Sequence, residues 1–279
     1  MPIVHAIVLG ITQGLSEFLP ISSSGHLLLV PWLFGWHDFA GRGADLEKTF
    51  DVALHLGTLV GAVAYFWGDL RAFAVAGVRS IRTRTVENDT TARMAWLLLI
   101  SAIPGAIVGG LFDSWISDHL GQIWLIATML IVFGLVLLVA DRLEGYRPNA
   151  EFSLRDALVM GTAQAVALQP GVSRSGLTIT AGRWLRFDRD GAARLSFLMS
   201  IPITAGAVVY KGAKLVADGG IPAGFGGAFF WGVVASGLTG FLAIWGTLRY
   251  VRTRSFSPFV VYRVAVGVIV FALLLSTFR

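Results

Sequence analysis

The sequence predicts an all-α, polytopic membrane protein made of two inverted repeats, each a re-entrant helical hairpin followed by three transmembrane helices. The 279-residue chain is 55% hydrophobic and only 14% charged, whereas soluble proteins carry about 25% charged residues. Residues 121–140 and 219–248 contain no charged residue over the length of a membrane-spanning helix. Two further hydrophobic regions are each interrupted in the middle by a polar turn, which is the observation that separates hairpins from full spans.

Six full-length spans follow from the hydrophobic pattern: residues 48–67, 94–112, 121–140, 191–210, 225–247 and 258–277. The regions 3–35 and 154–186 differ, because the proline-containing turns "LPISSSGH" and "QPGVSRSG" divide them. Each half is too short to cross a bilayer as a helix. We therefore predict that each of these two regions enters and leaves the membrane on the same side.

The two broken regions also resemble each other. Shifting the first by 151 residues aligns Gly10, Gln13, Ser22, Ser24 and Gly25 with Gly161, Gln164, Ser173, Ser175 and Gly176. The segments "GAVAY" at 61–65 and "GAVVY" at 206–210 also correspond. We interpret residues 1–279 as one membrane domain, with repeat one at about 1–140 and repeat two at about 154–279. An odd number of spans in each copy makes the second copy inverted.

Loop charges predict the orientation. Loop 68–93 carries five arginines, and the stretches 141–155 and 249–254 carry three each, whereas the predicted loop 113–120 has two aspartates and no lysine or arginine. Basic loops mark the cytoplasmic side. Both termini then lie outside, the first hairpin enters from outside, the second enters from the cytoplasm, and the two polar turns meet inside the membrane.

Other features exclude several classes of protein. The chain has no cysteine, so disulfides and thiolate metal sites are excluded. Its N-terminus lacks the basic segment of a cleaved signal peptide. The net charge of +5 is explained by cytoplasmic loops, and we expect no nucleic-acid partner.

The first hairpin has the composition of an anion site. Gln13 and Glu17 are four residues apart and so share a helix face. Pro20 ends this helix, and Ser22 is a natural N-cap for the next one. The unpaired N–H groups of such a helix start bind anions, phosphate especially. These groups belong to Ser23, Ser24 and Gly25, and His26 follows with a side chain that can carry a proton near neutral pH.

The second hairpin repeats this arrangement and adds a cation. Ser173 is another N-cap, and Gly176 allows close approach of the backbone. Arg174 is an ionisable residue inside a membrane segment, which makes it a functional candidate, and its planar fork suits a phosphate held by two hydrogen bonds. Ser175 and Thr178 can add hydroxyl donors.

Structural explanations remain open beside these functional ones. Serine and glycine often serve as packing surfaces in membrane helices, and Glu17 could pair with Arg174 to hold the hairpins together. The role of Asp51 and His55 could be no more than to satisfy polar neighbours. Arg263 is interpreted as a structural partner or a snorkelling side chain. The joint presence of two anion-binding turns, an arginine, a histidine and a carboxylate favours a phosphate site.

The hairpin segments "QGLSEFLPISSSGHL" and "LQPGVSRSGLTIT" resemble the two signature regions of the undecaprenyl-diphosphate phosphatase family of the bacitracin-resistance type. The segments "KTFDVALHLGTL" and "FSPFVVYRVAVG" extend this resemblance over essentially the whole chain. The family often has a glutamate where this chain has Gln13, and an amide side chain where it has His55.

The resemblance implies a multi-pass protein of the bacterial inner (plasma) membrane that hydrolyses undecaprenyl diphosphate to undecaprenyl phosphate and inorganic phosphate. This reaction recycles the lipid carrier for peptidoglycan synthesis, and hence for cell wall biogenesis and cell shape, and it confers bacitracin resistance. The implied partners are the lipid diphosphate and membrane lipids, and a homodimer is left open.

For the reaction we assign Arg174 and the two half-helix N-termini to the phosphate oxygens. Ser23 is the expected nucleophile, with His26 as its base or as the acid for the leaving group; alternatively His26 attacks directly or activates water. Glu17 is expected to orient His26 or to bind a divalent cation, Mg²⁺ or Ca²⁺, that bridges diphosphate oxygens. The expected substrate-binding residues are Gln13, Ser22, Ser24, Gly25, Ser173, Ser175, Gly176 and Thr178.

A rival function is a transporter or flippase of a polyprenyl phosphate lipid, because inverted repeats with broken helices are a transporter architecture. For either function we expect the site to open to the outer, periplasmic face. The hairpin that enters from outside carries Glu17, Ser23 and His26, the groups expected to exchange protons with water.

Overall fold

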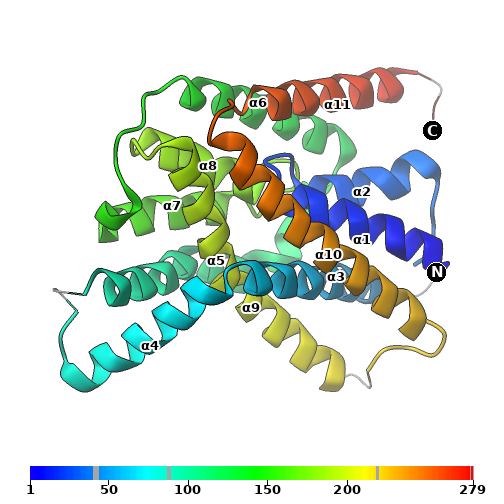
Figure 1. Cartoon of the computed structure of the whole chain (residues 1–279). Coiled ribbons are helices and arrows are strands. Elements are labelled where there is room, and N and C mark those ends of the chain that lie inside the picture. Colours follow the sequence, from blue (N-terminus) through cyan, green and yellow to red (C-terminus); the bar gives the residue numbers. More distant parts are fainter. Residues whose placement is uncertain (40–43, 87–88, 218–219, 277, 279) are drawn as a thin grey trace.

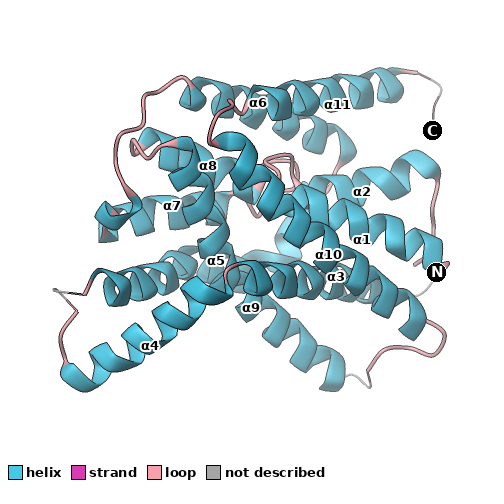
Figure 2. Ribbon diagram, in the orientation of Figure 1, coloured by secondary structure: helices cyan, strands magenta, loops and turns pink. Residues whose placement is uncertain are grey.

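The chain is helical throughout the part that the computed structural model describes, residues 1–39, 44–86, 89–217, 220–276 and 278, with backbone alone at 44–45, 113–114 and 117–118 (Figures 1 and 2). These ranges contain no strand, only an isolated bridge between Arg147 and Phe187. Both chain ends lie at the same edge of the molecule (Figure 1). The all-α prediction is confirmed.

The two broken regions form helical hairpins, as predicted. The first consists of α1 (Ile3–Phe18) and α2 (Ser23–Phe34), and the second of α7 (Leu154–Val166) and α8 (Arg174–Trp184). Helix α1 ends before Pro20 because a residue that precedes proline favours extended backbone, and Leu19 has ψ 138°. The hairpins enter the molecule from opposite edges, so that their turns meet near its centre (Figure 1).

Five of the six predicted spans are long, apolar helices able to cross a membrane, and the protein is a multi-pass membrane protein. The five helices are α5 (Thr90–Leu120), α6 (Ile123–Asp141), α9 (Arg189–Ala217), α10 (Gly226–Val251) and α11 (Ser257–Leu275). The sixth predicted span corresponds to α3 (Ala44–Tyr65), which qualifies only together with the next helix. The sequence of α3 holds four charged residues before position 52, which lowers its average hydropathy.

Two predicted loops are helical instead. Residues 68–93 were expected to be a loop, but most of them belong to α4 (Trp67–Thr83), which is bent by 81° from α3. Residues 113–120 continue α5 instead of forming a loop, and the side chains of the two aspartates there lie outside the described residues. A further 3₁₀ turn, η1 (Asn149–Glu151), precedes α7.

Each hairpin packs closely on a long helix from the other half of the chain. Helix α1 packs on α10, and α7 packs on α5. A Cβ atom at Gly10 would lie 2.4 Å from the Gly232 carbonyl oxygen, and one at Gly161 would lie 2.5 Å from that of Ser101. Only glycine fits either position. Because Gly10 and Gly161 are equivalent under the 151-residue shift, these contacts support the repeat, while its inverted symmetry remains our prediction.

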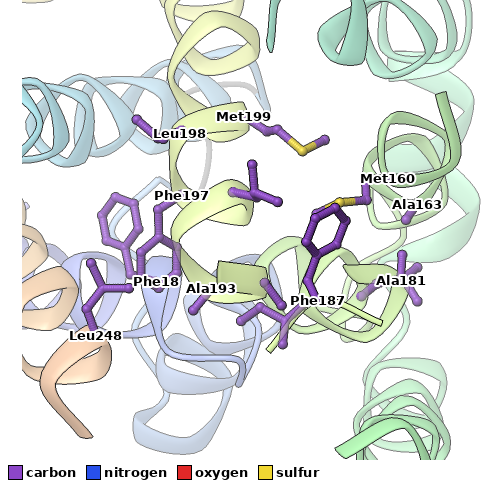
Figure 3. Close-up of a cluster of buried hydrophobic side chains, with 14 of the residues drawn as sticks. Phe18, Met160, Ala163, Ala181, Phe187, Ala193, Phe197, Leu198, Met199 and Leu248 are labelled. Atoms are coloured by element: carbon purple, nitrogen blue, oxygen red, sulfur yellow. The ribbon is translucent and has the colours of Figure 1, made fainter. Parts of the chain in front are cut away.

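A buried hydrophobic cluster fixes the inner end of α1 (Figure 3). The ring of Phe18 meets that of Phe197 on α9 edge-on at 5.4 Å between centroids, and Leu248 of α10 belongs to the same cluster. Since Phe18 directly follows Glu17, this packing sets where the carboxylate lies relative to α9.

Candidate active site

Ser22 and Ser173 start the second helix of each hairpin in the same way. Both have positive φ angles, 80° and 75°, a region that is costly for residues other than glycine and that often marks a functional turn. The Ser22 hydroxyl accepts from the Gly25 N–H at 3.4 Å, and the Ser173 hydroxyl accepts from the Gly176 N–H at 3.0 Å. The predicted N-caps are confirmed.

These caps change the set of free anion donors. The N–H group of Gly25 was expected to be free for a phosphate, but the Ser22 hydroxyl already accepts from it, as the Ser173 hydroxyl does from that of Gly176. At the starts of α2 and α8, the first two N–H groups have no acceptor among the described residues. They belong to Ser23 and Ser24 in α2 and to Arg174 and Ser175 in α8. Two helix N-termini with free donors therefore meet at one place, which is a favourable site for an anion.

Hydrogen bonds join the two turns directly. The Gly171 N–H donates to the Ser22 hydroxyl oxygen at 3.1 Å, and the Ser175 hydroxyl donates to the Leu19 carbonyl at 3.1 Å. Residues about 150 positions apart in the chain thus form one polar centre, as the sequence predicts.

Arg263 of α11 ties both turns to the rest of the protein. Its side chain is fully buried, and its guanidinium donates to the carbonyls of Pro20 at 3.2 Å, Gly171 at 3.0 Å and Val172 at 2.9 Å. Further bonds reach two carbonyls of α6. The structural reading of Arg263 is confirmed, but the side chain does not snorkel. It holds the two hairpin turns in register.

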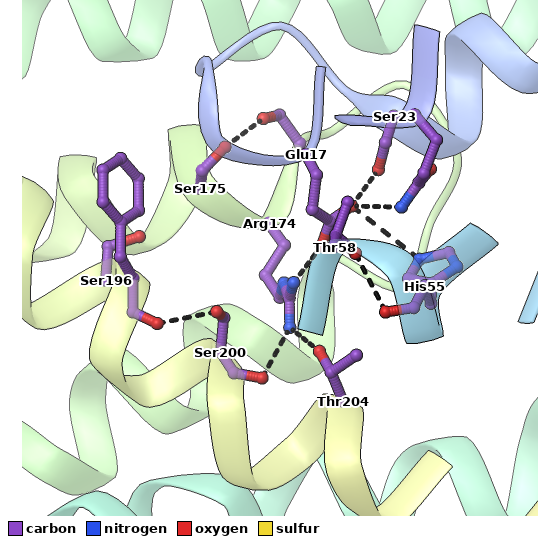
Figure 4. A network of polar contacts seen from close by, with 12 residues as sticks. Glu17, Ser23, His55, Thr58, Arg174, Ser175, Ser196, Ser200 and Thr204 are labelled. Atoms are coloured by element: carbon purple, nitrogen blue, oxygen red, sulfur yellow. Dashed lines mark hydrogen bonds and ion pairs between the residues drawn. The ribbon is translucent and has the colours of Figure 1, made fainter. Parts of the chain in front are cut away.

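Glu17 is the centre of a polar cluster beside these turns (Figure 4). Its carboxylate accepts from Gln13 Nε2 at 3.1 Å and from the Ser23 hydroxyl, and it forms an ion pair with Arg174. His55 Nε2 lies 3.7 Å from the same carboxylate. The side-chain amide oxygen of Gln13, Oε1, is buried and has no hydrogen-bond partner.

Arg174 is aimed by α9. Its guanidinium donates to the Thr204 hydroxyl at 2.8 Å and to the Ser200 carbonyl at 3.3 Å (Figure 4). Sequence reasoning missed both residues, although Ser196, Ser200 and Thr204 recur every four residues and so form a hydroxyl stripe on one face of α9. Such a stripe in a membrane helix was the available signal.

His26 does not join the Glu17 cluster. Its Nδ1 lies 2.7 Å from the Ser22 carbonyl oxygen, and its Nε2 lies 2.8 Å from the hydroxyl of Tyr262 on α11. The expected contacts of His26 with Ser23 and with Glu17 are therefore absent between these described residues, because the helix turn directs the ring toward α11. Glu17, not His26, accepts from the Ser23 hydroxyl.

The remaining predicted residues divide between the site and its support. Thr178 is fully buried, and its hydroxyl bonds the Arg174 carbonyl at 2.7 Å and the Ser196 hydroxyl at 2.6 Å. Its hydroxyl therefore holds α8 on α9, and its role in substrate binding stays a prediction. The Ser173 and Ser175 hydroxyls lie 3.3 Å apart within the turn, whereas Ser24 is half-buried at the start of α2.

The donor atoms suit a hard cation that shares ligands with the substrate. Within the described ranges no group of three or more His, Asp or Glu side chains could hold a metal. The Gln13 side chain turns its Nε2 toward Glu17, and its Oε1 is buried without a hydrogen-bond partner, so Glu17 and Gln13 Oε1 are the two oxygen donors that this helix offers. Mg²⁺ typically takes one or two carboxylates and completes its shell with water and substrate phosphates, so these residues fit such an ion only together with a phosphate ligand.

Comparisons with known proteins show the family of this chain. Residues 6–269 match the family model described as bacitracin resistance protein BacA. A protein of Pelobacter propionicus is 46% identical over 99% of this chain and 98% of its own length, and one of Geobacter sulfurreducens is 44% identical over 99% and 100%. Both are named undecaprenyl-diphosphatase, as is a Pelotomaculum thermopropionicum protein that is 45% identical over 98% and 97%. The family model and the nearly full-length relatives lead to one conclusion: the chain belongs to the bacitracin resistance protein BacA family.

Proposed function

We propose that this protein hydrolyses undecaprenyl diphosphate to undecaprenyl phosphate and inorganic phosphate. The observation that carries the proposal is the meeting of two free helix N-termini with Arg174, deep among membrane helices. A diphosphate headgroup needs such donors, and a long isoprenoid tail needs a surrounding of lipid-facing helices. The names of the relatives support the same substrate.

In this proposal Arg174 exchanges partners when the substrate binds. In the structure the guanidinium pairs with Glu17. A phosphate with two negative charges competes for the fork of Arg174, and the N–H groups of Ser23 and Ser24 hold its other oxygens. Glu17 then gives up its ion pair with Arg174, while the oxygen that accepts the hydrogen bond from the Ser23 hydroxyl stays in place to take its proton.

Ser23 is the nucleophile in this mechanism. Its oxygen forms a bond to the terminal phosphorus, the bond from that phosphorus to the bridging oxygen breaks, and undecaprenyl phosphate leaves. The Ser23 proton passes to Glu17. Water then attacks the phosphorus of phosphoserine, the bond from that phosphorus to the Ser23 oxygen breaks, and inorganic phosphate leaves. The Ser23 oxygen takes the proton back from Glu17, and the proton that the water loses leaves the site. The hydrogen bond from Ser23 to Glu17 favours this route over direct attack by His26.

The proposal includes a divalent cation that would bind together with the substrate. The Glu17 carboxylate and the side-chain oxygen of Gln13, Oε1, would hold Mg²⁺ or Ca²⁺ beside the diphosphate. Such an ion neutralises phosphate charge when bound. The protein residues alone position the headgroup and Ser23.

We further propose that the protein resides in the bacterial inner membrane, with its site open to the periplasmic face. The arginines of α4 and of the loop after it, Arg71, Arg79, Arg82 and Arg84, support the assignment of the opposite side to the cytoplasm. In that position the enzyme returns lipid carrier to peptidoglycan synthesis, and thereby supports cell shape and bacitracin resistance.

The test is phosphate release by the purified protein from undecaprenyl diphosphate in detergent. The proposal predicts one inorganic phosphate and one undecaprenyl phosphate for each lipid consumed. A protein that moves the lipid across vesicles without releasing phosphate is a transporter, and the proposal then fails.

A further inference from the structure

His26 and Tyr262 form a polar pair that the mechanism above leaves without a role. The Tyr262 hydroxyl lies 2.8 Å from His26 Nε2, and the two rings are stacked with their centroids 5.6 Å apart and their planes 15° apart. His26 is buried on α2, whereas Tyr262 on α11 keeps 42% of its surface exposed. The pair joins the first hairpin to α11 beside the two turns.

The contacts of the ring define its tautomer. His26 Nδ1 lies 2.7 Å from the Ser22 carbonyl oxygen, and because a carbonyl oxygen only accepts, Nδ1 must donate. In a neutral ring the lone pair then lies on Nε2, so the Tyr262 hydroxyl donates to that nitrogen. The only basic atom of His26 thus faces α11.

The neighbouring residue holds α11 in the orientation that this contact requires. Arg263 follows Tyr262 directly and donates to carbonyls of both hairpin turns. Its many bonds fix the rotation of α11 about its axis, so that the preceding side chain points at α2. Tyr262 contacts His26 and Arg263 contacts the two turns, so these neighbouring residues of α11 fix His26 relative to the turns.

We propose that Tyr262 is a positioning residue of the proposed phosphatase reaction. Its hydroxyl holds the orientation of the ring whose tautomer the Ser22 carbonyl sets. The proton that the water attacking phosphoserine loses then passes through the Tyr262 hydroxyl to His26 Nε2, while Glu17 takes the Ser23 proton. This inference rests on the proposed function. It adds a residue that acts through His26 and that sequence reasoning did not identify.

The test replaces Tyr262 by phenylalanine, which removes one oxygen atom and keeps the ring. General acid–base catalysis contributes typically about 10²–10⁴-fold, so a misplaced His26 should lower kcat about tenfold or more and leave KM unchanged. The matched control is Tyr250→Phe, since the Tyr250 ring also packs against α11, edge-on to Phe259. This control should keep wild-type kinetics, and apparent unfolding temperatures of both variants check their folding.

A double-mutant cycle shows whether Tyr262 acts through His26. In a His26→Gln background, Tyr262→Phe should cost no further activity, because its target is gone. Independent, multiplying losses would overturn the inference, as would a Tyr262→Phe enzyme within twofold of wild type or one changed in KM alone.

A measurement that needs no substrate separates this inference from the proposed function. The protein labelled with ¹⁵N-histidine should show a His26 Nε2 without a proton, assigned by its loss in His26→Gln. In Tyr262→Phe, the ¹⁵N chemical shift of His26 Nε2 should move toward the value of a histidine nitrogen that accepts no hydrogen bond. A protonated Nε2 in the wild type would refute the assigned geometry even if phosphate release is normal. Absence of phosphate release from the wild type refutes the proposed function.

Discussion

At the residue scale, Glu17 and Arg174 are each shared between several partners. The carboxylate serves Gln13, Ser23 and Arg174, and Arg174 also bonds Thr204. A buried pair of this kind is costly to break from one side, because the remaining charge is left without compensation. Exchange of Glu17 for a substrate phosphate keeps an anionic partner on Arg174, and the Glu17 carboxylate regains compensation only when it takes the Ser23 proton.

The first prediction concerns the shape of the cation at position 174. Arg174→Lys keeps the charge but loses the planar fork that reaches Glu17 and Thr204 together. Turnover of undecaprenyl diphosphate should fall at least tenfold, which is about 1.4 kcal/mol of barrier. Steady-state phosphate release measures this, and near-normal turnover would remove the two-bond phosphate role from Arg174.

The second prediction concerns Gln13 and the cation. Chelator should abolish phosphate release, and Mg²⁺ or Ca²⁺ should restore it. Gln13→Leu removes the unpartnered oxygen and should raise the cation concentration for half-maximal activity about tenfold. Gln164→Leu is the control, because Gln164 is the equivalent residue of the other hairpin and its Oε1 is also buried without a partner, but its Nε2 donates to the Ser101 carbonyl and not to Glu17. Equal cation requirements in both variants would remove Gln13 from the cation site.

At the scale of elements, the two hairpins are the parts that the sequence predicts best. The serine caps, the prolines and the short apolar halves are local signals, and Ser22 and Ser173 lie where those signals place them. Helix α4 escaped prediction because a search for uncharged windows overlooks an amphipathic helix in which Arg71, Arg79 and Arg82 alternate with apolar residues.

Contacts between distant elements could not be predicted from one sequence. The approach of Tyr262 to His26 spans 236 residues, and that of Arg263 to Pro20 spans 243. Nothing in either local pattern specifies its partner, because helix packing decides it. The predicted contact between Ser23 and His26 was wrong for the same reason. Helix spacing alone does not decide whether the His26 ring points to Ser23 or to α11, and the structure has it on α11.

The third prediction tests the link between α11 and the turns. Arg263→Met should leave the carbonyls of Pro20, Gly171 and Val172 without their donor, and each unsatisfied buried group costs about 1–3 kcal/mol. The apparent unfolding temperature in detergent should fall by several degrees, and activity should fall with it. Arg252→Met is the control, because the Arg252–Asp190 pair is exposed and surface pairs contribute little. Equal stability of the two variants would show that Arg263 does not hold the turns.

At the scale of the whole molecule, two hairpins from opposite edges bring free helix N-termini together at the centre of a helical protein (Figure 1). Neither hairpin contains a complete site. The first supplies Glu17 and Ser23, the second supplies Arg174, and α9 and α11 orient them. This division explains how an anion-binding centre can form inside a bundle of apolar helices.

The fourth prediction concerns the face to which the site opens. A chain without cysteine allows single cysteines at Ser24, at the buried Ser175 and, as a cytoplasmic control, at the exposed Thr85 of the α4–α5 loop. A membrane-impermeant thiol reagent added to intact spheroplasts should label position 24, with protection by lipid diphosphate, and should label position 85 only after the membrane is opened. Position 175 should react poorly in both cases. Labelling of position 24 only in opened membranes would place the entrance on the cytoplasmic side.

The central claim is that Ser23, paired with Glu17 and facing Arg174, transfers the terminal phosphate of undecaprenyl diphosphate to water. Its most direct test is phosphate release by purified wild-type protein and by Ser23→Ala, with Ser24→Ala as the neighbouring control at the same helix start. The wild type and Ser24→Ala should convert the lipid to its monophosphate, and a well-folded Ser23→Ala should lose nearly all of this activity. Substantial turnover by Ser23→Ala would contradict the account.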